Sequence, residues 1–465
     1  MSPQLLPQEL FDRVLGFMQL SDMLCASHVS CAWRQAVFHH PKFCLDILID
    51  DLSEGSLYWA RKRLHYSCGR GLPFDLTIDL RTEHVEIERT ILVWICSCLN
   101  VVRRLRITLP SIYSLSLWGV IGRAAPNIEI FELVFHMDPY ALETSVYHIP
   151  PNIFANTAPC LRRVKLMEVL APLEPITAFA GVTDFSLMFW GNRWQMFPRE
   201  LFEFMPRLKR LTLAGGRIQF ASDSITPRVT SGLHQLEHLD MTYNPNRNLE
   251  ILQRLDTSVV PALTIVNADE DVVYAALTPL RAPFHITITR AISTEFHIIV
   301  YSESTRQIRR FVEFDRKYAA GSTDYSALFD NKDFASQLSS LTLATSLWSM
   351  IVPWLPAPYT ALSRLIVFID DPSAESNLHV LPREPLECPG VEVLVFQAKY
   401  EFAYVEEEDL VNFVGRLTSK RVELQLHRVL VRRSHSGPSL EGRFKSVSYS
   451  VSKVDILTVP DIVSG

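Results

Sequence analysis

A short pattern, apolar-x-x-apolar-x-apolar, recurs along most of this 465-residue chain. Its second half alternates apolar and other residues as a half-buried β-strand does, and neighbouring copies mostly start about 20 to 33 residues apart. A repeat of this period predicts stacked units of secondary structure, each covering the next. Clear copies begin at Leu161, Leu208 and Leu236, and looser copies begin at Val102, Ile128, Val182, Leu362 and Val391.

Helix-like segments precede several of these predicted strands. Examples are "RTILVWICSCLN", "LWGVIGRAAP", "RELFEFMPR" and "EEEDLVNFVGRL". In the last of these, Leu410, Phe413, Val414 and Leu417 fall on one helical face, and acidic residues occupy the first turn, where the helix dipole favours them. Because parallel strands need a crossover between them, alternating helices and strands predict an α/β solenoid with a parallel sheet.

The repeat resembles the leucine-rich repeat, whose pattern is L-x-x-L-x-L-x-x-N/C. Only "LEHLDMTYN" has the asparagine at the expected place, Asn244, so the array is expected to be irregular. Strand side chains alternate between faces, so the residues between the apolar positions should line the open, concave surface. These residues are either ordinary solvated surface or a target-binding surface. They are Arg104, Arg106, Glu132, Arg163, Lys165, Asp184, Arg210 and Asp240.

Two parts of the predicted array are less regular. Near residues 290–340 two further strands, "EFHIIVYS" and "RQIRRFVEF", are followed by a long loop-like segment, so we expect an interruption of the solenoid there. Residues 434–465 lack strong periodicity and are expected to form a terminal cap or tail. The solenoid is therefore predicted over residues 73–433, preceded by a connection with a linker helix at 43–72.

The opening segment, from Leu5 to Pro41, lacks the repeat and shows signals of helices instead. Pro7 suits the start of a helix, and Ser21 and Ser30 are candidate caps of a second and a third helix. Three helices in about forty residues bury too little surface to be stable alone. The segment is either a cap on the following domain or a unit that a partner covers.

The same segment resembles an F-box, a motif that opens with Leu-Pro and Glu-Leu and closes with Val-(Ser/Cys)-x-x-Trp-Arg. The matching residues are Leu6, Pro7, Glu9, Leu10, Val14, Leu24, Val29, Trp33 and Arg34, with Met18 and Met23 where leucine is more usual. The resemblance places an F-box at residues 1–42 and implies binding to the Skp-type adaptor of a cullin–RING ubiquitin ligase. The residues that would form or support that interface are Leu6, Pro7, Leu10, Val14, Leu24, Val29, Trp33 and Val37.

Charge and composition argue against several classes of protein. The formal net charge is −6, whereas binding to nucleic acid or to anionic membranes calls for a basic surface. Glycine is scarce, 17 of 465 residues, and the longest apolar segments are too short to span a membrane. The eight cysteines follow no disulfide framework. We expect a soluble cytoplasmic or nuclear protein with free thiols.

Motifs of catalysis and metal binding do not stand out. The chain has no G-x-S-x-G, no G-x-x-x-x-G-K-[ST] and no H-E-x-x-H sequence. Cys25, His28, Cys31 and Cys44 are possible zinc ligands, but their spacing fits no usual zinc pattern, and packing positions are the preferred interpretation. We therefore expect no cofactor, no metal and no catalytic activity.

The prediction is an α/β protein, a small three-helix F-box followed by an irregular leucine-rich-repeat-like solenoid with a parallel sheet. Its expected function is that of a substrate-recognition subunit of an SCF-type cullin–RING ubiquitin ligase. The F-box would bind the adaptor, and through it the cullin scaffold, while the solenoid binds a target protein. The alternatives are an interaction scaffold acting outside a ubiquitin ligase, or an enzyme whose site only folding assembles.

Overall fold

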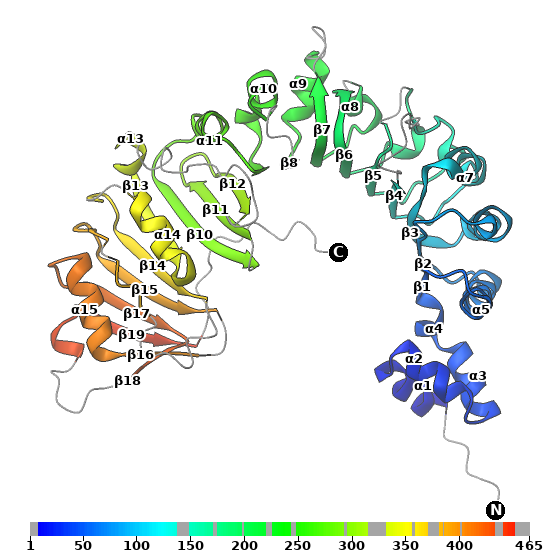
Figure 1. The fold of residues 1–465 in the computed structure, drawn as a ribbon, viewed down its shortest axis with the longest axis horizontal. Coiled ribbons are helices and arrows are strands. Elements are labelled where there is room, and N and C mark those ends of the chain that lie inside the picture. Colours follow the sequence, from blue (N-terminus) through cyan, green and yellow to red (C-terminus); the bar gives the residue numbers. More distant parts are fainter. Residues whose placement is uncertain are drawn as a thin grey trace, which may run out of the picture. The chain divides into compact units, whose positions relative to one another are not determined.

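All eight predicted repeats form β-strands in the computed structural model of the chain (Figure 1). Contacts divide the chain into two units, Met1–Gln235 (unit 1) and Leu236–Gly465 (unit 2), which are described separately. The structure describes residues 8–136, 148–170, 174–197, 200–219, 226–242, 248–292, 295–314, 332–355, 359–370, 381–384, 386–399, 402–432 and 440–451.

Unit 1 begins with a cluster of short helices and continues as a parallel sheet. The helical cluster contains α1 (Gln8–Phe17), α2 (Leu20–Ser27), α3 (Cys31–His39) and α4 (Pro41–Leu45). The strands are β1 (Asp46–Ile49), β2 (Phe74–Asp79), β3 (Val102–Pro110), β4 (Ile130–His136), β5 (Arg163–Met167), β6 (Asp184–Met196) and β7 (Arg210–Gln219). They pair in parallel in chain order, so each repeat adds one strand to the edge left by the previous one.

Helices lie along one side of this sheet (Figure 1). They are α5 (Glu54–Arg70), α6 (Leu92–Cys98), α7 (Ser114–Ile121), α8 (Leu201–Phe204) and α9 (Pro227–Leu233). Strand residues that face the helices, such as Leu105 in β3 and Phe131 in β4, are fully buried, as are Ile95 in α6 and Leu117 in α7. The core of unit 1 is therefore a continuous apolar layer between sheet and helices, as the alternating pattern predicts.

The array begins earlier than the sequence analysis places it. Residues 43–72, expected to be a connection, contain β1 and α5, and Ile47 and Ile49 of β1 are buried beside β2. The α5 helix has clear boundaries, because the Ser53 hydroxyl accepts a hydrogen bond from the Ser56 amide and Gly71 ends it at φ 62°. A left-handed glycine lets the last carbonyls of a helix accept hydrogen bonds. The sheet of unit 1 thus starts at Asp46.

Part of the sheet in unit 2 is antiparallel. Its strands lie in the order β8, β9, β12, β11, β10, β13, β14, β15, β17 and β19. The two strands predicted near residues 290–340 are both present. Strands β10, β11 and β12 form an antiparallel meander, which pairs in parallel with β9 on one side and with β13 on the other. The bounds are β8 (His238–Thr242), β9 (Ala262–Val266), β10 (Phe284–Ile292), β11 (Glu295–Ser302), β12 (Gln307–Phe314), β13 (Leu338–Ala344), β14 (Arg364–Ile369), β15 (Val393–Ala398), β17 (Glu423–His427) and β19 (Ser446–Ser450).

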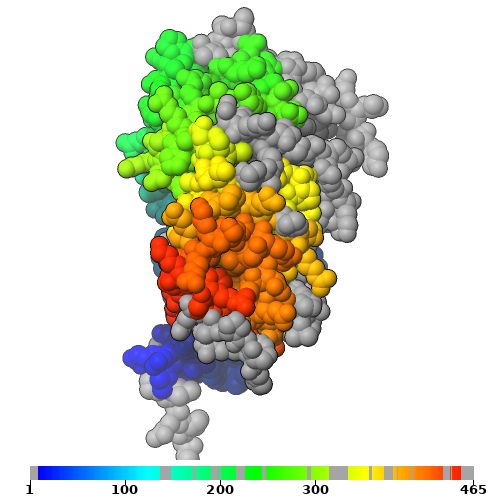
Figure 2. Space-filling model, turned by 90° about the vertical axis from the view of Figure 1, so that its left-hand side faces the viewer, coloured from blue at the N-terminus to red at the C-terminus, as the bar shows by residue number. Residues whose placement is uncertain are grey.

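Short helices connect the strands of unit 2. They are α10 (Asn248–Arg254), α11 (Glu270–Leu277), α13 (Lys332–Ala335), α14 (Trp348–Ile351) and α15 (Glu407–Leu417). In α15 the predicted face is largely confirmed, because Leu410, Phe413 and Leu417 are buried and Val414 is partly buried. Figure 2 shows this C-terminal part of unit 2 in orange and red.

The segment 434–465, expected to be a cap or tail, contributes a strand of the sheet. Within it β19 pairs in parallel with β17, while residues 433–439 and 452–465 lie outside the described parts of the chain. Beside the main sheet, β16 (Ala403–Glu406) and β18 (Val429–Arg432) form a separate parallel pair.

Candidate functional site

Two adjacent apolar stripes run along α1. Phe11 and Leu15 point into the core of the helical cluster and are 6% and 0% exposed. Leu10, Val14 and Phe17 lie one position away at helical spacing and are 46%, 44% and 84% exposed. The buried stripe is enough to pack α1 into the cluster, so the exposed stripe of Leu10, Val14 and Phe17 is not needed for the core. An exposed apolar stripe of this kind is typical of a partner interface.

The other predicted interface residues differ in their exposure to solvent. Val29, after α2, is 71% exposed, whereas Leu24 and Trp33 are partly buried. Val37 is fully buried, so it can support the surface only from the core beneath. Leu6 and Pro7 lie outside the described residues. Phe17, the most exposed of the apolar side chains on α1, was not among the predicted interface residues.

Local hydrogen bonds fix the helices of the cluster. The predicted cap at Ser30 is confirmed, because its hydroxyl accepts from the Trp33 amide at 3.2 Å. The predicted cap at Ser21 is wrong, because α2 already begins at Leu20. The Lys42 ammonium donates to the carbonyl of Met18 at 2.6 Å and to that of Gly16 at 3.2 Å. It thereby binds carbonyls at the end of α1, where a cation also complements the helix dipole.

The cluster is packed against the first helix of the array. The ring centroid of Phe38 lies 5.6 Å from that of Tyr66 and 6.2 Å from that of Trp59, and both partners are on α5. The buried Arg63 of α5 donates its Nε–H to the Phe43 carbonyl at 2.7 Å and a second N–H to the Asp46 carbonyl. Aromatic contacts and buried hydrogen bonds therefore join the helical cluster to the array without a flexible linker.

Seven of the eight predicted target-binding residues lie together on the sheet face of unit 1 that is opposite the helices. We call this set, with Asp75 of β2, the charged face. Arg104 is in register with Asp75 and Arg106 with Glu132, and Lys165 is the next neighbour of Glu132. Arg163 is in register with Asp184, which in turn pairs with Arg210. The alternation of strand side chains places these residues as predicted.

Ion pairs connect several of these residues. Arg106 Nε lies 3.3 Å from Glu132 Oε2, and Arg210 Nη1 lies 3.5 Å from Asp184 Oδ1. Sequence reasoning missed Asp75, which accepts two hydrogen bonds from Arg103 and lies 3.7 Å from Arg104. Its strand, "FDLTID", has an alternating apolar pattern that could have been found, since Leu76 lies 29 positions before its register partner Leu105 (105 − 76), within the spacing of the repeat.

The eighth residue, Asp240, lies on β8 in unit 2 and belongs to a different polar group. Burial raises the pKa of the Asp240 carboxyl, although a hydrogen bond from the Thr242 hydroxyl at 2.6 Å opposes the shift. Arg310 of β12, which also favours the charged form of Asp240, lies 3.1 Å from His297. The Nε2 atom of His297 in turn lies 2.5 Å from Oε1 of Glu295. No pattern in the sequence indicated that these residues would meet.

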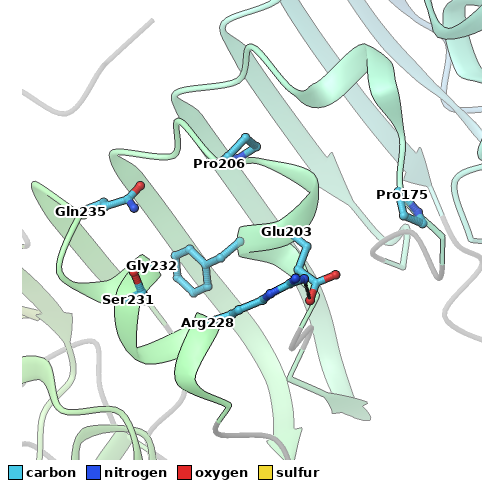
Figure 3. A pocket seen from close by; sticks show the side chains of 8 residues that line it. Pro175, Glu203, Pro206, Arg228, Ser231, Gly232 and Gln235 are labelled. Atoms are coloured by element: carbon cyan, nitrogen blue, oxygen red, sulfur yellow. Dashed lines mark ion pairs between the residues drawn. The ribbon is translucent and has the colours of Figure 1, made fainter.

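A hollow of about 390 Å³ opens on the helical side of unit 1 between α8 and α9 (Figure 3). An ion pair between Arg228 and Glu203 lies at one side of it. Gly232 lies against the Phe202 ring so closely that a Cβ there would be 2.2 Å from ring carbons. The residues that line the hollow are Pro175, Phe202, Glu203, Pro206, Arg228, Ser231, Gly232 and Gln235.

The possible zinc ligands differ in their surroundings. Cys44 is buried, and burial raises the pKa of its thiol, whereas Cys25 and Cys31 are exposed. Within the described residues, no group of three or more His, Cys, Asp or Glu side chains is placed to hold a metal ion. None of the helices described is long and apolar enough to cross a membrane.

The comparison with known protein families gives one match. It covers the helical cluster with its exposed stripe, and not the sheet of either unit. No curated protein matches the chain. Residues 4–45 match the family model of the F-box domain, so the chain carries an F-box domain at these residues.

Proposed function

We propose that this protein is a substrate-recognition subunit of an SCF-type cullin–RING ubiquitin ligase. F-box domains bind Skp-type adaptors, and F-box proteins are generally non-catalytic adaptor subunits. The observation that carries the proposal is the exposed stripe of Leu10, Val14 and Phe17 on the F-box itself. An adaptor would cover this stripe together with Val29, Leu24, Trp33, Leu6 and Pro7, while Val37 supports it from the core.

The array would hold the target. We propose that the strand–helix repeats of both units form a leucine-rich-repeat-like scaffold whose open sheet face binds a target protein. Extended repeat arrays commonly bind partners on such a surface. The chain would supply no catalytic residue. It would raise the effective concentration of the target near the ubiquitin-carrying enzyme and orient it, in the cytoplasm, the nucleus or both.

The packing of the F-box on α5 supports this tethering role. Arg63, Trp59 and Tyr66 of α5 contact residues of α3, α4 and β1, so the adaptor-binding end is joined to the sheet through buried contacts. A rigid junction holds a bound target at a defined distance from the adaptor, whereas a flexible one would spread it over many distances.

Co-purification with a Skp-type adaptor and a cullin tests the proposal. The full chain should form a stoichiometric complex that is lost when Leu10 and Val14 are both replaced by Glu. The matched control replaces Leu115 of α7 and Val93 of α6, which are 70% and 56% exposed, by Glu. A folded wild-type chain that binds no adaptor would contradict the proposal and favour a scaffold acting outside a ubiquitin ligase.

A further inference from the structure

The charged face of unit 1 carries cations in excess of carboxylates. It contains the five cations Arg104, Arg106, Arg163, Lys165 and Arg210 against three carboxylates, a net charge of +2. The whole chain has a formal net charge of −6. The excess of cations lies on β3 to β7, because Asp46 of β1 and Asp79 of β2 are on the same side of the sheet as Asp75. Local fields of this kind select partners and speed their association.

Most of these cations already have a carboxylate partner. Asp75 accepts two hydrogen bonds from Arg103 and lies near Arg104, and Glu132 and Asp184 are paired with Arg106 and Arg210. The three carboxylates of the face are thus engaged, and further negative charge must come from outside it.

Two neighbouring cations remain without a partner of this kind. Arg163 and Lys165 project from the same side of β5, at the centre of the charged face, and both are partly exposed. Within the part of the chain that the structure describes, neither forms an ion pair. A ligand that supplies carboxylates at this point would gain two charge-assisted contacts and break no existing pair.

Apolar side chains lie beside this pair of cations. Ile130 is the register neighbour of Arg163 on β4, and Val134 and Met188 lie at the next positions along the same face. All three are partly exposed. A matching ligand would therefore carry acidic side chains interspersed with apolar ones.

We propose that the charged face binds an acidic segment of the target protein in an extended conformation, with its carboxylates at Arg163 and Lys165. This inference rests on the proposed function and specifies the class of target. Strands lie about 4.8 Å apart and an extended chain advances about 3.3 Å per residue, so crossing from β2 to β7 takes about seven residues. A nucleic acid fits less well, because Glu132 and Asp184 stand on either side of Lys165 and Arg163 and would repel a continuous row of phosphates.

Fluorescence anisotropy with a defined probe tests the proposal on the full chain. The probe is a labelled peptide of about ten residues in which Glu and Leu alternate, long enough to cross the face. Peptides with Gln or Lys in place of Glu are the controls. The acidic probe should bind, more weakly at higher salt, and Arg163→Glu/Lys165→Glu should weaken binding at least about tenfold.

A matched variant controls for net charge. Arg61→Glu/Arg123→Glu reverses two exposed cations outside the charged face and should leave the affinity for the probe within about twofold of wild type, since distant surface charges are largely screened. Equal losses in both double variants would overturn the proposal. So would equal binding of the Gln peptide, or tighter binding of a single-stranded oligothymidylate that depends on the same two residues. Arg163→Gln/Lys165→Gln with an unchanged melting temperature separates lost binding from lost folding.

Adaptor binding by the same variants separates this inference from the proposed function. Arg163→Glu/Lys165→Glu should bind the Skp-type adaptor as wild type does, because β5 lies outside the F-box. A wild-type chain that binds the adaptor but not the acidic probe overturns the inference alone. A wild-type chain that binds neither overturns both.

Discussion

The rings of Phe11 and Trp33 meet edge to face, with centroids 4.7 Å apart and planes at 86°. Aromatic pairs favour this arrangement, and here it joins α1 to α3. Trp33 is therefore part of the core of the F-box as well as a residue of its proposed surface.

We expect Trp33→Ala to lower the stability of the F-box by about 3 kcal/mol, because the substitution removes a large, partly buried ring from a small core. Adaptor binding should weaken as well, partly through unfolding. Differential scanning fluorimetry of the full chain, with Trp33→Phe as the conservative variant, checks this prediction. A melting profile unchanged by Trp33→Ala would show that the ring does not support the core.

Arg63 should control the rigidity of the junction between the F-box and the array. Arg63→Met removes the hydrogen bonds to the Phe43 and Asp46 carbonyls while keeping most of the aliphatic volume. We expect faster hydrogen exchange in α4 and β1 and a loss of about 2 to 3 kcal/mol, since buried carbonyls lose their donors. The exposed Arg61 on the same helix supplies the control, Arg61→Met. Equal exchange in both variants would contradict this role.

A second buried arginine should stabilise unit 2. Arg309 is 1% exposed and donates hydrogen bonds to the carbonyls of Ala276, at 3.1 Å, and of Val260, at 3.1 Å. Burial lowers its pKa to about 10, so it is still charged at neutral pH. Arg309→Leu should cost about 3 kcal/mol by urea unfolding, whereas Arg281→Leu, at an exposed site, should change stability by less than about 0.5 kcal/mol. A neutral effect of Arg309→Leu would refute the assignment.

The repeat pattern predicted much of this fold because it reports which strand positions are buried. Alternation placed Arg104, Arg163 and Asp184 on one face without any knowledge of the pairing. It did not reveal the antiparallel meander of β10 to β12, because parallel and antiparallel strands can show the same apolar pattern. It also missed β1, whose four residues are too few to show a period.

The F-box was predictable at a different level. Its motif identified the segment, and the preference of serine for helix N-caps identified the Ser30 cap, but neither showed which apolar positions remain exposed. Trp33 and Val37, four residues apart, were both assigned to the interface, whereas Val37 is buried in the core and Trp33 only partly so. Exposure depends on the packing of three helices together, and this is not contained in the spacing along one of them. The contacts of Arg63 and Arg309 join residues 17 or more positions apart and likewise leave no local signal.

Asp240 should make the stability of unit 2 depend on pH. Burial raises its pKa above the ordinary value of 3.8, so the folded protein holds this proton more tightly than the unfolded chain does. Its contribution to stability is therefore greatest below pH 3.8 and falls as the pH rises through the folded-state pKa. Asp240→Asn keeps an acceptor for Thr242 and should raise the melting temperature at neutral pH but not below pH 3.8. A lower melting temperature for Asp240→Asn at neutral pH would mean that ionised Asp240 is stabilising.

The exposed stripe on α1 is the central claim, and calorimetric titration of the full chain with a purified Skp-type adaptor tests it most directly. Wild type should bind one adaptor, and Leu10→Glu should weaken the affinity by at least about tenfold, because burying a leucine contributes on the order of 1.5 to 3 kcal/mol. The melting temperature of Leu10→Glu should stay that of wild type, since Leu10 is 46% exposed, and Leu115→Glu should bind normally. Equal adaptor affinity for wild type and Leu10→Glu would contradict the account.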